Sequence, residues 1–227
     1  MTAQKANSEH QPQPRPRRPG RPRGASVNAD SRNKLLDAAL SLFARQGIAE
    51  TSLNAIAREA GVTSAMLHYY FNSREQLLDV MIEERFLPLR RDITTVLADN
   101  AESPSTALLL MTERLAELAD TYPWFAPLWL QEVLGETNQL RQHMHARFGK
   151  TERNNTLATI IRWQNEGKLN RELEPALIFT SLLSLILVPF CMLRQQQNTQ
   201  EPFNFDRQAI VNHALTLLKG GIGQPQP

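Results

Sequence analysis

From Ala29 onward, apolar residues recur every three or four positions, the spacing that places them on one face of an α-helix. The first such stripe consists of Leu35, Leu36, Ala39, Leu42 and Phe43. Asp30 or Ser31 can cap the start of this helix, and Gly47 can end it. Because no stretch shows sustained alternation with a period of two, the pattern predicts an all-α chain without a sheet.

The later stripes predict about nine helices in total. A second helix is expected from Ser52 to Gly61 and a third from Thr63 to about Tyr70. A fourth begins at Ser73, which forms a capping box with Gln76, and Pro88 can bend it. The helices that follow are expected at about 105–121, 123–134, 138–166, 174–196 and 205–219.

Four segments follow from these elements. Residues 1–28 read as a disordered basic arm, because the first 24 are rich in Pro, Gln and Arg without apolar periodicity. A small helical unit is expected over 29–89, with a helix-turn-helix at about 52–71. A larger helical unit is expected over 90–221, followed by a flexible tail at 222–227.

Composition and charge narrow the class of protein. The 227 residues are 41% hydrophobic, which is enough for a globular core. Cys191 is the single cysteine, so an intramolecular disulfide is excluded, and a reducing cytoplasm is the expected location. The first 24 residues hold six Lys or Arg and one acidic residue, against a net charge of +2 for the chain. Such a basic end favours a polyanion as partner.

The segment from Ala176 to Leu193 runs for 18 residues without a charge. That length lies at the lower limit of a membrane span, but a helix buried on all sides has the same composition. Polar Thr180 and Ser184, Pro189, and the lack of flanking Trp or Tyr favour the buried helix. No secretory signal is expected, because no apolar stretch follows the basic start.

Residues 51–71, TSLNAIAREAGVTSAMLHYYF, have the pattern of a helix, a tight glycine turn and a second helix. The second helix carries small, hydroxyl and aromatic side chains that cannot all be buried, and such a surface suits the DNA major groove. An ordinary helical hairpin remains open on this spacing alone, as does a buried His68 without a role in binding.

Residues 31–82 resemble the N-terminal domain of the TetR/AcrR family of bacterial transcription regulators. The motifs that carry the resemblance are Ala38-Ala39, Leu42-Phe43, Gly47, Thr51-Ser52, Ile56-Ala57, Ala60-Gly61-Val62-Thr63, Leu67, Tyr70-Phe71, Ser73, Glu75 and Leu77-Leu78. The chain departs from the usual pattern at Met66, His68 and Arg74. Arginine at position 74 retains a positive charge, where the family commonly has lysine.

The resemblance implies contacts to DNA. Ser64, Ala65 and His68 would face base edges, whereas Tyr69, Tyr70 and Arg74 would contact phosphates, and Ser52 and Thr63 would also lie at the DNA backbone. In the arm, Pro19-Gly20-Arg21-Pro22 resembles the core of an AT-hook, which would place Arg21 and Arg23 in the minor groove. The alternative is a basic tail that is merely solvated.

For the larger unit, the resemblance implies an effector pocket and a homodimer. The candidate pocket residues, which could equally be ordinary core, are Met111, Trp124, Phe125, Trp129, Trp163, Phe190 and Met192. The candidate interface residues, on the last two helices, are Phe179, Leu183, Ile186, Ile210 and Leu217. The expected effector is small and apolar or aromatic.

We therefore expect a cytoplasmic, homodimeric repressor that binds a palindromic operator and is released by its effector. Neither a cofactor nor a metal is expected, and no enzyme motif such as GxSxG or HExxH occurs. Two alternatives are an architectural DNA-binding protein without an effector and a membrane-tethered regulator.

Overall fold

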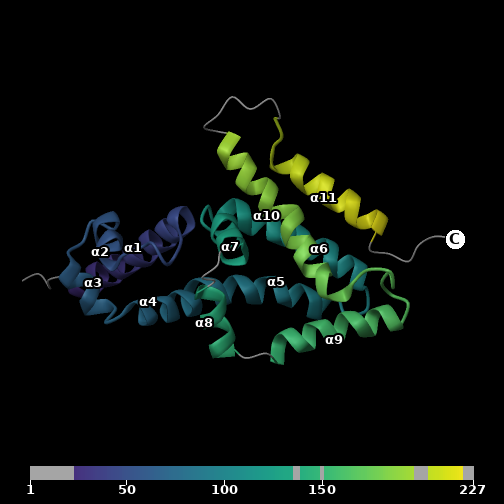
Figure 1. Cartoon of the computed structure of the whole chain (residues 1–227), viewed down its shortest axis with the longest axis horizontal. Coiled ribbons are helices and arrows are strands. Elements are labelled where there is room, and N and C mark those ends of the chain that lie inside the picture. The colour runs from purple at the N-terminus through teal and green to yellow at the C-terminus, as the bar shows by residue number, and fades with distance from the viewer. Residues whose placement is uncertain (1–22, 135–138, 149–150, 197–203, 222–227) are drawn as a thin grey trace, which may run out of the picture.

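The computed structural model describes residues 23–134, 139–148, 151–196 and 204–221, and no strand occurs among them (Figure 1). The described residues hold eleven α-helices, a π-helical turn and a 3-10 turn. The elements are α1 (Arg23–Gln46), α2 (Leu53–Glu59), α3 (Ser64–Tyr70), α4 (Arg74–Met81), η1 (Ile82–Phe86), α5 (Leu87–Asp99), α6 (Pro104–Thr121), α7 (Phe125–Leu134), α8 (Gln139–Phe148), α9 (Thr151–Asn165), η2 (Pro175–Leu177), α10 (Ile178–Gln196) and α11 (Arg207–Gly221). The all-α prediction is confirmed.

Helix α1 begins earlier than expected, at Arg23 rather than near Asp30. Residues 23–28, which were assigned to the arm, are therefore helical, and Asp30 forms an ion pair of 2.7 Å with Lys34 one turn later instead of capping the helix. The other end lies where expected. Gly47 adopts a φ of +87°, and its N–H donates to the carbonyl of Phe43 at 2.9 Å.

A π-helical turn divides the predicted fourth helix into α4 and α5. The N–H of Leu87 donates to the carbonyl of Ile82, five residues back, at the end of η1. Pro88 follows in the first turn of α5, where its missing N–H is tolerated. The wider turn thus lets the chain pass the proline without a break. The predicted 138–166 helix also appears as two helices, α8 and α9, which with this division accounts for eleven helices instead of nine.

The first core belongs mainly to α1–α4, with large buried side chains at Phe43, Ile56 and Phe71. It also includes Leu128 of α7 and Leu140 of α8, which come from the larger unit. Gln131 of α7 adds a hydrogen bond of 3.0 Å to the carbonyl of Ala44 in α1. The small unit is therefore packed against the larger one, beside the start of α5 (Figure 1).

Two further cores lie in the larger unit. One packs α6, α7, α10 and α11 together around Phe190, and the other joins α6, α9 and α10 around Trp163. Helices α10 and α11 form an antiparallel pair against α6 (Figure 1).

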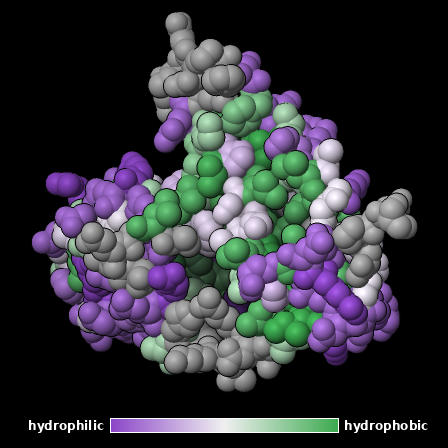
Figure 2. Space-filling view, turned by 45° about the vertical axis from the view of Figure 1, so that its right-hand side comes forward, coloured by the Kyte–Doolittle hydropathy of each residue, from purple (hydrophilic) through white to green (hydrophobic). Residues whose placement is uncertain are grey.

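Helix α10 is covered on one side only, which corrects the expectation of a helix buried on all sides. Within the described residues, the segment from Pro175 to Gln195 is long and apolar enough to cross a membrane, and 28% of its most apolar 18-residue window is buried in the protein. Its exposed apolar side chains include Leu177, Val188 and Met192, at 56%, 39% and 48% exposure. Figure 2 shows hydrophobic residues gathered over this part of the surface, in contrast to the hydrophilic surface of the small unit.

Candidate nucleic-acid interface

Two side-chain caps set the geometry of the α2–turn–α3 unit. The hydroxyl of Ser52 accepts the N–H of Ala55 at the start of α2, and that of Thr63 accepts the N–H of Met66 at the start of α3. Between the helices, Gly61 has a φ of +67°, a conformation that glycine adopts without strain. Helix α3 thus has a fixed start and leaves α2 at a defined angle.

Helix α3 buries one face and exposes the other. Leu67 and the following Phe71 lie in the first core. Ser64, Ala65, His68 and Tyr69 are exposed, with Tyr69 at 76%, while Tyr70 is half-buried with its ring 5.2 Å from that of Tyr69. An exposed His68 excludes the alternative of a buried histidine. The predicted base-reading residues therefore share one solvent-facing surface.

Arg74 has a structural role that its sequence position did not reveal. Its guanidinium donates to the carbonyl of Ile48 at 2.6 Å and to the carbonyl of Thr51, both in the connection between α1 and α2. The side chain therefore ties the start of α4 to the start of the α2–α3 unit. A phosphate contact by Arg74, expected from the resemblance, would have to use the remaining N–H donors of the guanidinium.

Sequence reasoning missed Asn54. This exposed residue of α2 accepts a hydrogen bond of 2.9 Å from the hydroxyl of Ser64, the first residue of α3. Nothing in the sequence distinguishes Asn54 from any polar residue on a solvated helix face, because its partner is brought near only by the turn at Gly61. Of the two candidate arm residues, Arg21 lies outside the described residues and Arg23 is the first residue of α1.

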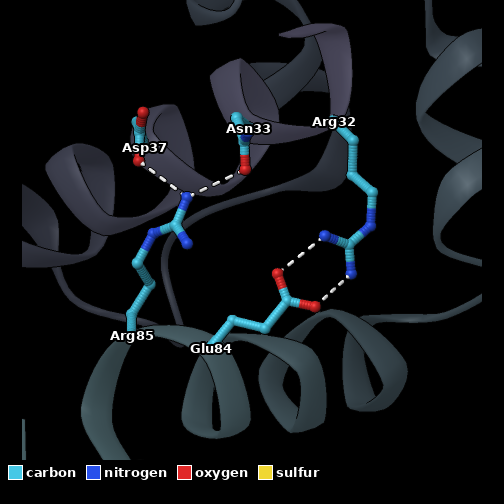
Figure 3. Close-up of polar contacts among 5 residues, drawn as sticks. All are labelled: Arg32, Asn33, Asp37, Glu84 and Arg85. Carbon is cyan, nitrogen blue, oxygen red and sulfur yellow. Dashed lines mark hydrogen bonds and ion pairs between the residues drawn. The ribbon is translucent and has the colours of Figure 1, made fainter. Parts of the chain in front are cut away.

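A group of five polar residues, here termed the latch, joins α1 to η1: Arg32, Asn33, Asp37, Glu84 and Arg85 (Figure 3). Arg32 donates two hydrogen bonds to the Glu84 carboxylate, at 2.7 and 2.6 Å, and these bonds hold the pKa of Glu84 below its usual range. Arg85 reaches Asn33 at 3.1 Å and Asp37 at 3.4 Å. The latch fixes the small unit to the turn that leads into the larger one.

The predicted pocket residues lie mostly in the cores, and none of them lines an open cleft found among the described residues. Met111, Phe125, Trp163 and Phe190 are buried, whereas Met192 is exposed. The cleft, of about 280 Å³, lies between α5, the end of α6 and the start of α11. Its lining residues are Leu89, Asp92, Arg114, Glu117, Leu118, Asp120, Thr121, Tyr122 and Arg207. Apolar side chains here adjoin charges of both signs, including the Arg207–Asp120 pair at 3.5 Å.

The predicted interface residues divide into two groups. Ile186 and Ile210 lie inside the protomer, at 0% and 4% exposure, where they pack in the second core. Leu217 is 51% exposed, and Phe179 and Leu183 are half-buried. Leu217 of α11 and Val188 of α10 are therefore open to solvent, whereas the two isoleucines belong to the core.

Comparison with known proteins places this site in a family. The sequence model described as "Bacterial regulatory proteins, tetR family" matches residues 35–81, which span the second half of α1 and all of α2–α4. The regulator SrpR of Pseudomonas putida is 37% identical over 70 residues, 31% of this chain and 33% of that protein. The regulator BetI of Agrobacterium fabrum is 30% identical over 132 residues, 58% of this chain and 64% of that protein. The chain thus spans between a third and about two thirds of these relatives.

Among solved structures, the ketosteroid transcriptional regulator KstR2 of Mycobacterium tuberculosis shares the fold, with a TM-score of 0.64. The superposition covers 85% of this chain and 94% of that one at 20% sequence identity, so it extends the likeness in fold to the larger unit. The signature of the tetR family of bacterial regulatory proteins thus lies on the helix-turn-helix described above, at residues 35–81, and the larger unit shares the fold of a solved regulator.

Proposed function

We propose that the protein is a DNA-binding transcriptional regulator that acts in the cytoplasm as a homodimer, and that it is a repressor. The observation that carries this proposal is the capped helix α3, which buries Leu67 and presents Ser64, Ala65 and His68 to solvent on one face. A short helix with small and polar exposed side chains can approach base edges in the major groove closely. Ser52, Thr63 and Tyr69 are exposed beside these residues and would contact phosphates.

We expect a second copy of the chain to bind the exposed face of α10 and α11. Val188 and Met192 are exposed on the long apolar segment that includes α10, and Leu217 is exposed on the neighbouring α11. A two-fold interface uses the same patch on both protomers, so each copy would bury the apolar surface of the other. It would also set two copies of α3 at a fixed distance, which requires a palindromic operator.

DNA binding is tested by selecting sites from a randomised duplex library with the full-length protein, followed by anisotropy titration of the selected site. The expected result is an enriched palindrome bound by two protomers, with affinity that falls steeply as salt rises. A protein that enriches no sequence, and binds all duplexes equally, would contradict the proposed regulator.

We place the effector site at the cleft between α5, α6 and α11. The cleft offers open space, whereas Met111, Trp163 and Phe190 are packed in the cores. Leu89, Leu118 and Tyr122 provide apolar walls for a small apolar or aromatic molecule. The solved relative KstR2 is described as a ketosteroid regulator, which supports an effector of this character.

The route from this cleft to DNA follows the chain. Leu89 and Asp92 of the cleft lie on α5, which continues from η1, and η1 is held to α1 by the latch. A ligand that moves α5 would therefore shift the small unit as a body and change the spacing of the two α3 helices. Because such coupling is reciprocal, operator DNA must weaken effector binding by the same factor.

The effector proposal is tested by measuring operator binding against a panel of aromatic, steroid and acyl compounds. At least one compound should release DNA, and Thr121→Trp, which fills the mouth of the cleft, should abolish that release while leaving operator affinity intact. Release that persists in this variant would move the effector site elsewhere. A protein that holds its operator against every compound would instead match an architectural role.

A further inference from the structure

The exposed bond between Asn54 and Ser64 carries an inference that rests on the proposed function and deepens it. The two residues lie ten positions apart, in the first turns of α2 and α3, and both are exposed. We infer that they form one base-reading unit of fixed polarity, in which Asn54 acts as hydrogen-bond donor and Ser64 as acceptor.

The polarity follows from the atoms that make the bond. A serine hydroxyl has one hydrogen, and that of Ser64 is directed to the Oδ1 atom of Asn54. The Oγ atom of Ser64 therefore meets DNA with its lone pairs. The bond also holds the Asn54 amide by its oxygen, which leaves the two N–H groups of Nδ2 as the groups that the side chain offers outward.

Ser64 differs in this respect from the other two hydroxyl residues of the site. The oxygens of Ser52 and Thr63 accept backbone N–H groups as helix caps, so each still has its own hydrogen to donate. Among these three, Ser64 is the residue whose hydrogen is committed to a neighbouring helix. Ser52 and Thr63 are thus suited to phosphate oxygens, and Ser64 is suited to an amino group.

These polarities specify bases. In the major groove, guanine presents the acceptors O6 and N7 and thymine presents O4, whereas cytosine presents an N–H donor and adenine presents an N–H donor beside its N7 acceptor. Asn54 should therefore select guanine or thymine, and Ser64 should select adenine or cytosine at a neighbouring position. The two-point contact that free asparagine makes with adenine needs both amide atoms, and the bond from Ser64 disfavours it.

The test is a randomised-site selection with the full-length wild-type protein and with Asn54→Asp and Ser64→Ala. Aspartate can still accept the Ser64 hydrogen bond but has no donor, so preference at the Asn54 position should move toward cytosine. Without Ser64, the Asn54 amide can turn and bind adenine, and preference should move toward that base. We expect a change of about 5- to 30-fold in relative affinity at the affected position.

Asn72→Ala provides the matched control, since Asn72 is an exposed asparagine of the same unit that follows α3. It should leave base preference unchanged. If Asn54→Asp and Ser64→Ala retain the wild-type preference at every position, with folding verified by circular dichroism, the bond is only a tie between helices and the inference fails. If the wild-type protein selects no site, the proposed function fails instead, so the two failures are distinguishable.

Discussion

At the scale of single residues, Arg74 shows how one side chain can serve both fold and binding. Its guanidinium donates to two carbonyls of the α1–α2 connection, and one of them, that of Ile48, also accepts the N–H of Thr51 at 3.3 Å. Its position at the start of α4 also keeps a positive charge near the proposed DNA surface. The two roles can be separated, because the first needs the planar fork of arginine and the second needs only the charge.

We predict that Arg74→Ala lowers the free energy of unfolding by about 1–3 kcal/mol, because charged hydrogen bonds to two carbonyls are lost. It should also weaken binding to all DNA sequences nearly equally, since phosphate contacts do not specify sequence. Arg74→Lys should lose stability but keep the slope of log affinity against log salt. Urea unfolding and salt titrations measure the two effects, and a loss confined to one operator variant would argue against a phosphate contact.

At the scale of elements, the latch makes the junction of α1 with η1 sensitive to pH. The pKa of Glu84 is depressed in the folded protein by the bonds from Arg32, so the latch stabilises the fold when Glu84 is ionised in both states. That contribution is present above the ordinary pKa of glutamate, about 4.3, and is lost as the pH falls through the lower folded pKa. Both side chains are partly exposed, which limits the contribution.

Glu84→Gln should therefore cost about 0.5–1 kcal/mol of unfolding free energy at pH 7. The difference from wild type should begin to shrink as the pH falls below about 4.3 and vanish only once the pH is below the lowered pKa of Glu84 in the folded protein. Urea unfolding over this pH range measures the effect. Glu50→Gln, at an exposed carboxylate outside the latch, is the control and should show little difference at either pH. A constant cost at all pH values would mean that the charge on Glu84 is not what stabilises the junction.

Helix starts and stops were predictable wherever one residue decides them. Gly47, Gly61 and the cap at Ser73 lie where the sequence placed them, although Gln76 accepts the N–H of Asn72 rather than that of Ser73. The π turn before Pro88 was not predictable, because an apolar stripe reads the same through a widened turn. The Arg74 and Asn54 contacts were missed for another reason: their partners lie 26 and 10 residues away and meet only after folding.

At the scale of the whole molecule, the exposed side of α10 and α11 predicts a dimer of about 51 kDa, twice the chain mass of 25.7 kDa. Val188→Asp, on the outer face, should give a folded monomer, because the charge is costly only when a partner covers it. Ile186→Asp, which places the charge in the core, should unfold the protein. Light scattering and circular dichroism distinguish the two, and a folded wild-type monomer would exclude the interface.

Residues 1–22 lie outside the described part of the chain, but their arginines support a further prediction. Deleting them should leave the dimer intact and lower the slope of log affinity against log salt by roughly 2–4 for each arm, at about 0.9 per phosphate neutralised. If the Gly20-Arg21-Pro22 segment lies in the minor groove, the loss should be larger beside A·T-rich flanks. Anisotropy titrations on A·T- and G·C-flanked sites test this. Equal losses of affinity on both kinds of site would mean that the arm contacts only phosphates.

The placement of Leu128 and Leu140 in the first core has a consequence for how the protein folds. Helices α2 and α3 have only seven residues each, too short to persist in water without tertiary contacts. Part of the core that buries them consists of side chains from α7 and α8, which lie more than 40 residues beyond α4 in the chain. During synthesis, the α2–turn–α3 unit can therefore complete its core only after α7 and α8 of the larger unit have been made. A fragment that stops before α7 would leave that core open to water.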